Sequence, residues 1–266
     1  MSALGAVSDG VIVAKRNLIK IKRVPDLLVF TTLQPIMFVV LFAYVFGGAI
    51  KIESSSYREY LIAGIFTQTV VFGAVITGMG LAEDIQKGII DRFRSLPMSP
   101  SAVLVGRTLS DVLNNVIVVV VMSITGLVVG WRIHTPLLEA LGGFVLLLAF
   151  GYAFSWVMAW VGLLAPSPEV VQNAAFIVIF PLTFVANTFV PLVTLPPPLR
   201  TFAEWNPVSA VTQAVREAFG NIPPHTPVPD VWSLQHPEIY SILWGVGLLL
   251  VFVPVASHQY RRAVSR

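Results

Sequence analysis

Six long apolar runs alternate with shorter, more polar segments along the chain. They cover residues 27–50, 60–81, 110–131, 137–164, 170–189 and 239–257, and each holds close to 20 or more mostly apolar residues. About 20 helical residues, at a rise of about 1.5 Å each, cross a hydrocarbon core of about 30 Å. The strands of a membrane barrel would instead show about 10 residues of alternating polarity. The pattern therefore predicts six transmembrane helices in an all-α membrane protein.

The segment before the first run has the pattern of an amphipathic helix. Its apolar residues recur every three or four positions, at Leu4, Val7, Val11, Ala14, Leu18 and Ile21. Five basic residues lie outside this stripe: Lys15, Arg16, Lys20, Lys22 and Arg23. Such a helix lies in the membrane interface with its basic residues toward anionic headgroups. Residues 1–26 are therefore predicted to form an interfacial helix, although a basic flank that retains the first span would also explain the charge.

A short helix is predicted between the second and third runs. Its apolar face carries Ile85, Ile89, Phe93 and Leu96, and its charged residues are mostly elsewhere. Pro97 ends it, and the following Ser-Pro pair has the cap and first-turn residues of a new helix that starts at position 100. Because a helix this short is marginal alone, it is expected to pack on the membrane ends of the spans or on another protein. A plain helical connector with solvated charges is the alternative.

A second amphipathic segment precedes the last run. Val208, Val211, Val215 and Phe219 mark one helical face, and a proline-rich stretch follows. This helix could dip into the outer leaflet or pack onto the outer ends of the spans. The adjacent charges of Arg216 and Glu217 argue against a full crossing.

Composition agrees with a membrane protein. The chain of 266 residues is 56% hydrophobic and only 12% charged, with a mean hydropathy of +0.80. Soluble domains carry roughly a quarter charged residues, so this chain lacks the polar groups to cover a water-facing surface. No cleavable signal peptide is evident, because the first run begins at Leu27 after a basic segment and is too long for a signal core.

The positions of the basic residues set the predicted orientation. Twelve of the 17 Lys and Arg residues fall in the segments on one side of the membrane, and the other five are Lys51, Arg58, Arg132, Arg200 and Arg216. The positive-inside rule then places both termini in the cytosol, with residues 258–266 as a cytosolic tail. The net charge of +3 is explained by this asymmetry, so nucleic acid is not expected as a partner.

No catalytic or metal-binding motif was found. The chain has no cysteine, no HExxH or GxSxG pattern and no Gly-Lys dipeptide, which a phosphate loop would need. Asp111 lies four residues after Arg107 at the start of the third run, which favours an interfacial ion pair over a proton relay. We therefore expect no enzyme, no metal and no bound cofactor, but a passive pore, a structural subunit or a permease driven from outside.

Uncharged polar residues in or near the spans have two possible uses. They are Asn114, Asn115, Gln172, Asn173 and Asn187. Such groups most often join helices by hydrogen bonds, and lining a substrate path is the sharper alternative. The aromatic residues Phe38, Phe42, Tyr44, Phe66 and Phe72 likewise suit either a hydrophobic substrate or ordinary packing and lipid anchoring.

Two stretches resemble one transporter family. The sequence LAEDIQKGIIDRFRSLPMSPSAVLVGR, residues 81–107, is similar to the segment between the second and third spans of type-2 ABC exporter permeases. The form DRFRSLPMSPSAVLVGR looks most like the daunorubicin/doxorubicin-resistance branch. LPPPLRTFAEWNPVSAVTQAVREAFG, residues 195–220, is similar to the outer segment of that family, including Asn206 and Pro207.

The resemblance implies a coupling helix that docks in a cleft of a separate ATPase subunit. The docking element would comprise Gly88, Ile89, Ile90, Asp91, Arg92, Phe93, Arg94, Ser95, Leu96 and Pro97. Within it, Arg92 and Arg94 would approach acidic or backbone acceptors on the ATPase, while the apolar residues fill the cleft. The N-terminal stripe would be the family's connecting helix, and residues 191–238 would contain its short re-entrant outer helices.

The same resemblance implies the assembly and its task. Two permease chains, expected as a homodimer, would work with two ATPase chains that bind ATP and Mg²⁺, in the plasma membrane of a prokaryote. The path would run between the permeases, lined by the first, second and fifth spans. The expected cargo is a hydrophobic or amphiphilic drug-like or lipid-like molecule. A polysaccharide or lipid-linked glycan is the alternative, and a non-transporting assembly protein is a more distant one.

Overall fold

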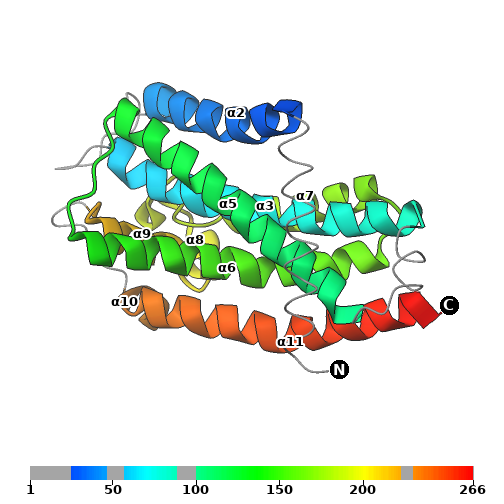
Figure 1. Cartoon of the computed structure of the whole chain (residues 1–266). Helices are drawn as coiled ribbons and strands as arrows, with labels where there is room; N and C mark the ends of the chain where they lie inside the picture. The colour runs from blue at the N-terminus through cyan, green and yellow to red at the C-terminus, as the bar shows by residue number, and fades with distance from the viewer. Residues whose placement is uncertain (1–24, 47–56, 89–99, 223–229, 266) are drawn as a thin grey trace.

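The computed structural model describes residues 25–46, 57–88, 100–222 and 230–265, and every regular element within these ranges is a helix (Figure 1). Residues 1–24 fall outside the described residues, and with them the predicted interfacial helix and its five basic residues. Residues 89–99 also fall outside, so that Gly88 alone represents the predicted coupling element.

Six helices form the body of the protein. They are α2 (Pro25–Leu41), which continues into the π-helical turn η1 (Phe42–Phe46), α3 (Tyr57–Gln86), α5 (Pro100–Val129), α6 (Leu137–Leu164), α7 (Pro168–Phe184) and α11 (Pro237–Ser265). Four of them contain apolar stretches long enough to cross a membrane: α3, residues 104–129 of α5, α6, and residues 237–262 of α11. The apolar stretches described in α2 with η1 and in α7 are shorter. The described residues thus contain four long spans rather than six.

Short helices gather at one end of this body. They are η2 (Leu192–Thr194), α8 (Pro197–Glu204), α9 (Pro207–Phe219) and α10 (Trp232–Gln235). Figure 1 shows α8, α9 and α10 at the left, where α5 ends and where α6 and α11 begin. The opposite end carries the end of α3, the beginning of α5 and the C-terminal end of α11. We call these the Phe219 end and the Gln86 end.

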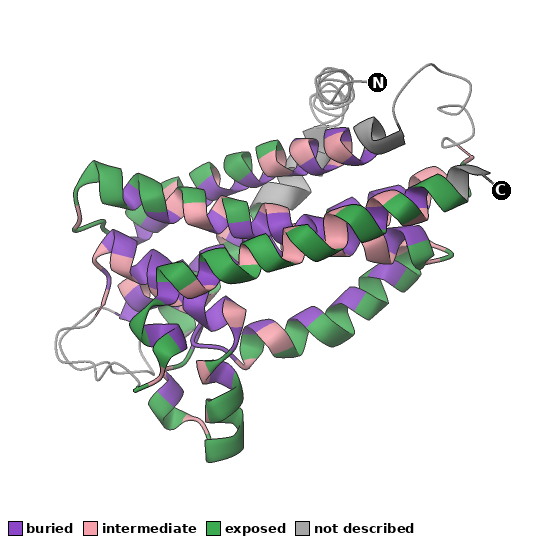
Figure 2. Cartoon of the chain, turned by 90° about the horizontal axis from the view of Figure 1, so that it is seen from below, coloured by how far each residue is buried: buried purple, intermediate pink, exposed green. Residues whose placement is uncertain are grey.

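The long helices pack around α3. Among the 18 consecutive residues that form the most apolar part of α3, 78% are buried. In the most apolar part of α11, only 11% of the residues are buried. The central helix is therefore α3, and α11 covers one side of the bundle with a largely exposed face (Figure 2). That face carries Ile242, Leu243 and Val251, apolar residues that suit contact with lipid.

Several helix ends differ from the expected ones. Helix α5 begins at Pro100, as its cap signal predicts, but this is ten residues before the apolar run. It stops at Val129 because Gly130 takes a positive φ of 104°. Helix α11 continues to Ser265, so the predicted tail from residue 258 is helical almost throughout. Helix α7 ends at Phe184, whereas the fifth apolar run extends to residue 189. The residues after Phe184 form a turn, residues 185–191, instead of continuing the helix.

Candidate functional site

A cavity of about 420 Å³ lies between α2, α3, α5 and α7. Three of these helices correspond to the first, second and fifth apolar runs, and α5 corresponds to the third. The cavity is within the usual size range of small-molecule sites, about 300–1,000 Å³. Its lining combines aromatic rings with neutral amides, and no charged side chain contributes to the part that the described residues form.

The aromatic part of the lining belongs to a continuous series of ring contacts. Phe176, Phe180 and Phe184 follow one another along α7, with ring centroids 4.9 and 4.0 Å apart. Phe184 then contacts Phe189 at 5.0 Å, Phe189 contacts Phe42 at 4.9 Å, and Phe42 contacts Phe38 at 5.6 Å. We call these six residues the phenylalanine series. Four members of the series line the cavity: Phe38, Phe176, Phe180 and Phe184. Together with Phe72 of α3 they form an apolar wall on which a flat molecule could stack.

Besides the hydroxyl of Thr69, the polar part of the lining consists of amides from four helices. They are Gln34 of α2, Gln68 of α3, Asn114 and Asn115 of α5, and Gln172 of α7. A Cβ atom at Gly73 of α3 would lie only 2.4 Å from Oδ1 of Asn115, so this glycine lets the amide approach the α3 backbone. Each amide can both donate and accept hydrogen bonds, which suits hydroxyl and carbonyl groups of a neutral ligand.

The residues singled out from the sequence divide between the cavity and other places. Asn114, Asn115 and Gln172 line the cavity, as do Phe38 and Phe72, whereas Asn173 is exposed elsewhere on α7. Phe66 belongs instead to a packed aromatic group with Trp131, Phe144 and Phe219, and Tyr44 is exposed. Asn187 lies in the turn that follows α7.

That turn, residues 185–191, is the second notable feature. Asn206 is 2% exposed and donates from Nδ2 to the carbonyls of Leu182, at 2.7 Å, and Val185, at 2.9 Å. Its Oδ1 accepts from the backbone N–H of Val208 at 2.9 Å, so Asn206 also caps α9, with Pro207 in the first turn. An Asn-Pro pair is typical of a helix start, so the cap agrees with the local sequence. The same side chain also satisfies carbonyls at the end of α7, which no local pattern indicates and which helps to explain why α7 stops there.

Arg216 holds the middle of this turn. Its side chain is 1% exposed, its Nε donates to the carbonyl of Tyr60 at 2.9 Å, and its Nη2 donates to the carbonyls of Asn187 and Thr188. The guanidinium also covers the Tyr60 ring, with Cζ 3.6 Å from the ring centroid. A buried cation is therefore stabilised by carbonyl dipoles and an aromatic face.

No described carboxylate forms an ion pair with Arg216. The adjacent Glu217 instead accepts a hydrogen bond from Nε2 of Gln213 at 3.0 Å. Burial raises the pKa of the Glu217 carboxyl, against the opposing effect of that hydrogen bond. The sequence placed Arg216 in an outer segment but did not predict that its side chain is buried. The small residues Ser209, Ala210 and Ala214, which lie outside the valine face, were the signal that α9 is enclosed on more than one side.

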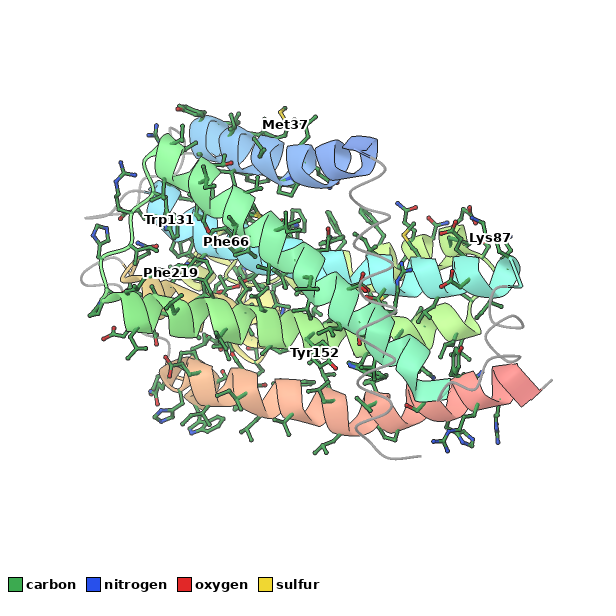
Figure 3. All side chains as sticks on the ribbon, viewed as in Figure 1. Met37, Phe66, Lys87, Trp131, Tyr152 and Phe219 are labelled. Atoms are coloured by element: carbon green, nitrogen blue, oxygen red, sulfur yellow. The ribbon has the colours of Figure 1, made fainter. Side chains whose placement is uncertain are left out.

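The far end of α9 is fixed as firmly as its beginning. Gly220 ends the helix with a φ of 67°, and Nε1 of Trp131 donates to Oδ1 of Asn221 at 2.6 Å. Phe219 contacts both Trp131 and Phe66 in edge-on geometry, and Figure 3 shows these three labelled side chains close together. Ten of the thirteen residues of α9 are buried. Among the described residues, α9 packs against the ends of the long helices, the second of the two arrangements expected for it.

The Gln86 end shows only the beginning of the predicted coupling segment. Gly88 has a positive φ of 64°, the backbone conformation that commonly follows the end of an α-helix. Lys87, labelled in Figure 3, pairs with Glu83 in the last turn of α3. Within the described ranges, no three acidic or histidine side chains are placed to hold a metal ion.

Comparison with known proteins places these features in context. The model of the ABC-2 type transporter family matches residues 10–219. The chain is 33% identical over 246 residues, 92% of its own length and 83% of the relative's, to "Daunorubicin resistance ABC transporter permease protein DrrB1" of Streptomyces coeruleorubidus. It is 25% identical over 235 residues, 86% of its length and 79% of the relative's, to "Probable doxorubicin resistance ABC transporter permease protein DrrC" of Mycobacterium tuberculosis. A third relative, "Doxorubicin resistance ABC transporter permease protein DrrB" of the same species, is 31% identical over 150 residues, 53% of this chain and 52% of its own.

Proposed function

The chain belongs to the ABC-2 type transporter family, and we propose that it is the permease subunit of an ABC exporter that moves a hydrophobic or amphiphilic drug-like molecule. The family is one of transport permeases, which agrees with the absence of catalytic motifs in the sequence. The observation that carries the proposal is the uncharged aromatic and amide cavity between α2, α3, α5 and α7. Its composition matches a ligand with flat apolar rings and several neutral polar groups.

The same lining argues against a lipid-linked glycan as cargo. A phosphate-linked headgroup carries negative charge, and cationic side chains are the partners that neutralise such a charge in a buried site. The described lining supplies amides but no Lys or Arg. The relatives whose names specify daunorubicin or doxorubicin resistance point the same way.

Six spans with both termini in the cytosol remain the best topology for this function. Helix α7 has 17 residues, about 26 Å at 1.5 Å each, which is close to the hydrocarbon thickness. Helix α2 with η1 extends over 22 residues. Lys87, Arg107, Arg261 and Arg262 cluster toward the Gln86 end, which supports placing that end at the cytosolic face of a prokaryotic plasma membrane. The Phe219 end is then exterior, and α8 and α9 are the short helices that close it.

Transport requires an ATPase and a second permease. The proposed docking element, Gly88 to Pro97, joins α3 to α5, so a movement of the ATPase would reach two helices that bound the cavity. Large apolar side chains remain exposed on α2 and α5 beside the cavity, including Met37, Val120 and Ile124. A second copy of the chain could cover these faces and close the cavity as a homodimer.

The docking role is tested by charge reversal. The double variant Arg92→Glu/Arg94→Glu should abolish transport and weaken association with the ATPase, because both proposed contacts to acidic or backbone acceptors would become unfavourable. Membrane insertion should stay intact, since neither residue lies in a span. Drug export from cells and co-purification of the ATPase are the measurements. Arg261→Glu, an exposed change on α11, is the control. Normal export by the double variant would exclude the docking role.

The cavity is tested with two variants of one helix. Phe180→Ala removes a ring that contacts both Phe176 and Phe184, whereas Ile177→Ala changes a residue that is 73% exposed and outside the lining. One aromatic contact is worth about 0.5–1.5 kcal/mol, so Phe180→Ala should raise the apparent KM for daunorubicin by about two- to ten-fold. Ile177→Ala should leave it unchanged. Equal effects of the two changes would exclude this cavity as the substrate site.

A further inference from the structure

A buried polar group joins α3 to α5 near the Gln86 end. Oγ1 of Thr77 donates to the Asp111 carboxylate, and Nη2 of Arg107 donates to the carbonyl of Ile76 at 3.2 Å. Nε of Arg107 lies 3.8 Å from Oδ2 of Asp111. Thr77 is fully buried and Asp111 is 8% exposed. We call Thr77, Arg107 and Asp111 the α3–α5 clamp.

The clamp is more than the interfacial ion pair expected from the sequence. The pair of Arg107 and Asp111 is present, but α5 begins at Pro100, so Asp111 lies eleven residues inside the helix. A pair within one helix would need no partner on α3. Here both members reach α3, one through Thr77 and the other through the Ile76 carbonyl. Ionisable groups at such positions are costly and commonly have a functional role.

Gly80 provides a second contact between α3 and α5. A Cβ atom at this position would lie 1.7 Å from Nη2 of Arg107, so the guanidinium passes directly over the α3 backbone at a residue without a side chain. Thr77 and Gly80 are three residues apart and thus lie on the same side of α3. The two helices are therefore held together at two neighbouring turns.

The clamp lies between two parts of the molecule that must communicate. Gly80 is six residues before the end of α3 and Arg107 is seven residues after the start of α5, so both lie about 10 Å along their helices from the connecting segment. Farther from the connecting segment, Phe72 and Gly73 of α3 and Asn114 of α5 line the cavity, and the lining extends to Ile76 and Met79 at the level of the clamp. A movement that enters through the connection between these helices therefore reaches the clamp before it reaches most of the cavity lining.

We propose that Thr77, Arg107 and Asp111 are positioning residues that make the Gln86 ends of α3 and α5 move as one rigid unit, so that ATP hydrolysis is coupled to rearrangement of the cavity. This inference rests on the proposed function. Without the clamp, the end of each helix can be displaced by the ATPase while the lining of the cavity stays in place. ATP is then hydrolysed without transport.

The test compares the hydroxyl groups of two threonines that are both fully buried. Thr77→Val removes the hydroxyl that crosses to α5 and keeps the shape of the side chain. Thr108→Val is the control, because the equally buried Thr108 hydroxyl donates only to the carbonyls of Leu104 and Val105 within its own helix. Wild type and variants are assembled with their ATPase in proteoliposomes, and daunorubicin transport and ATP hydrolysis are measured together.

In Thr77→Val, molecules transported per ATP hydrolysed should fall by about ten-fold, the size expected for a lost hydrogen bond to a charged group, while ATP hydrolysis continues. Thr108→Val should keep the wild-type ratio, and Thr77→Ser, which retains the hydroxyl, should restore it. A parallel fall of transport and hydrolysis in Thr77→Val, or an equal change in Thr108→Val, would overturn the proposal. A wild-type chain that transports nothing with its ATPase would instead contradict the proposed function.

A distance measurement tests the clamp without transport. The chain has no cysteine, so cysteines introduced at the exposed positions Gln86 of α3 and Leu113 of α5 can carry the only spin labels. The clamp predicts a narrow distance distribution in the otherwise wild-type chain and a broader one with Thr77→Val. Unchanged width with Thr77→Val would contradict a rigid connection between the two helices.

Discussion

Arg216→Met is expected to yield a permease that no longer folds stably. The change removes the donor to the carbonyl of Thr188 and one of the two side-chain donors to the carbonyl of Asn187, and it removes the cation from the face of Tyr60. A buried carbonyl without its donor costs about 1–3 kcal/mol and the loss of a desolvated cation–π contact about 2 kcal/mol, together a large part of the stability of an ordinary domain. We expect a strong drop in the melting temperature of the purified protein in detergent and in the yield of monodisperse protein.

Two further substitutions make this prediction specific. Arg216→Lys keeps the charge but not the planar fork that reaches Tyr60 and the turn together, so it should be intermediate. Arg200→Met breaks a partly exposed pair with Glu204 on α8, which should cost no more than about 1 kcal/mol. If Arg216→Met were as mild as Arg200→Met, the buried contacts of Arg216 would not be what holds the turn.

Gly162→Ala is the second change with a large expected effect. A Cβ atom at Gly162 of α6 would lie 2.2 Å from the carbonyl oxygen of Gly78 and 2.7 Å from its Cα atom. These are backbone atoms of α3, so the two helices must move apart, and overpacking of this kind costs about 1–3 kcal/mol. Gly162→Val should be worse because its branched side chain enters the same space. Thermal unfolding of the purified chain measures both effects.

The control substitution, Gly142→Ala, is expected to raise the stability of the protein instead of lowering it. Nothing lies within 4 Å of a Cβ atom at Gly142, which is also on α6. In such an open helical position, Gly→Ala stabilises by about 0.5–1 kcal/mol because alanine loses less backbone entropy on folding. Stabilisation by both alanine substitutions would show that α3 and α6 do not meet backbone to backbone.

Much of the helical pattern could be predicted because it depends on neighbours in the chain. The run at 137–164 coincides with α6, and Pro100 begins α5 as its first-turn signal indicates. The valine and phenylalanine face of α9 is fully buried, and Asn206 caps that helix. Hydropathy and short-range periodicity carry this information, since each helix satisfies its own backbone hydrogen bonds and must bury or expose one face.

The candidate site could be predicted only in part. The sequence supplied Asn114, Asn115 and Gln172 as possible lining residues, but hydrogen bonding between helices was the use it favoured for them. Their convergence with Phe72 and Phe180 on one cavity depends on how four helices are placed. The six-residue phenylalanine series likewise joins α2 to α7, which are far apart in sequence.

The sequence by itself determined that this protein is a helical membrane permease, because composition, run length and motif are local properties of the chain. The tertiary structure alone decided the place of its few buried charges. Arg216 contacts the carbonyl of Tyr60, 156 positions away, and Asp111 contacts Thr77 on another helix. A buried charge is stabilised by whichever dipoles surround it in three dimensions, and no pattern of spacing within one helix identifies those partners.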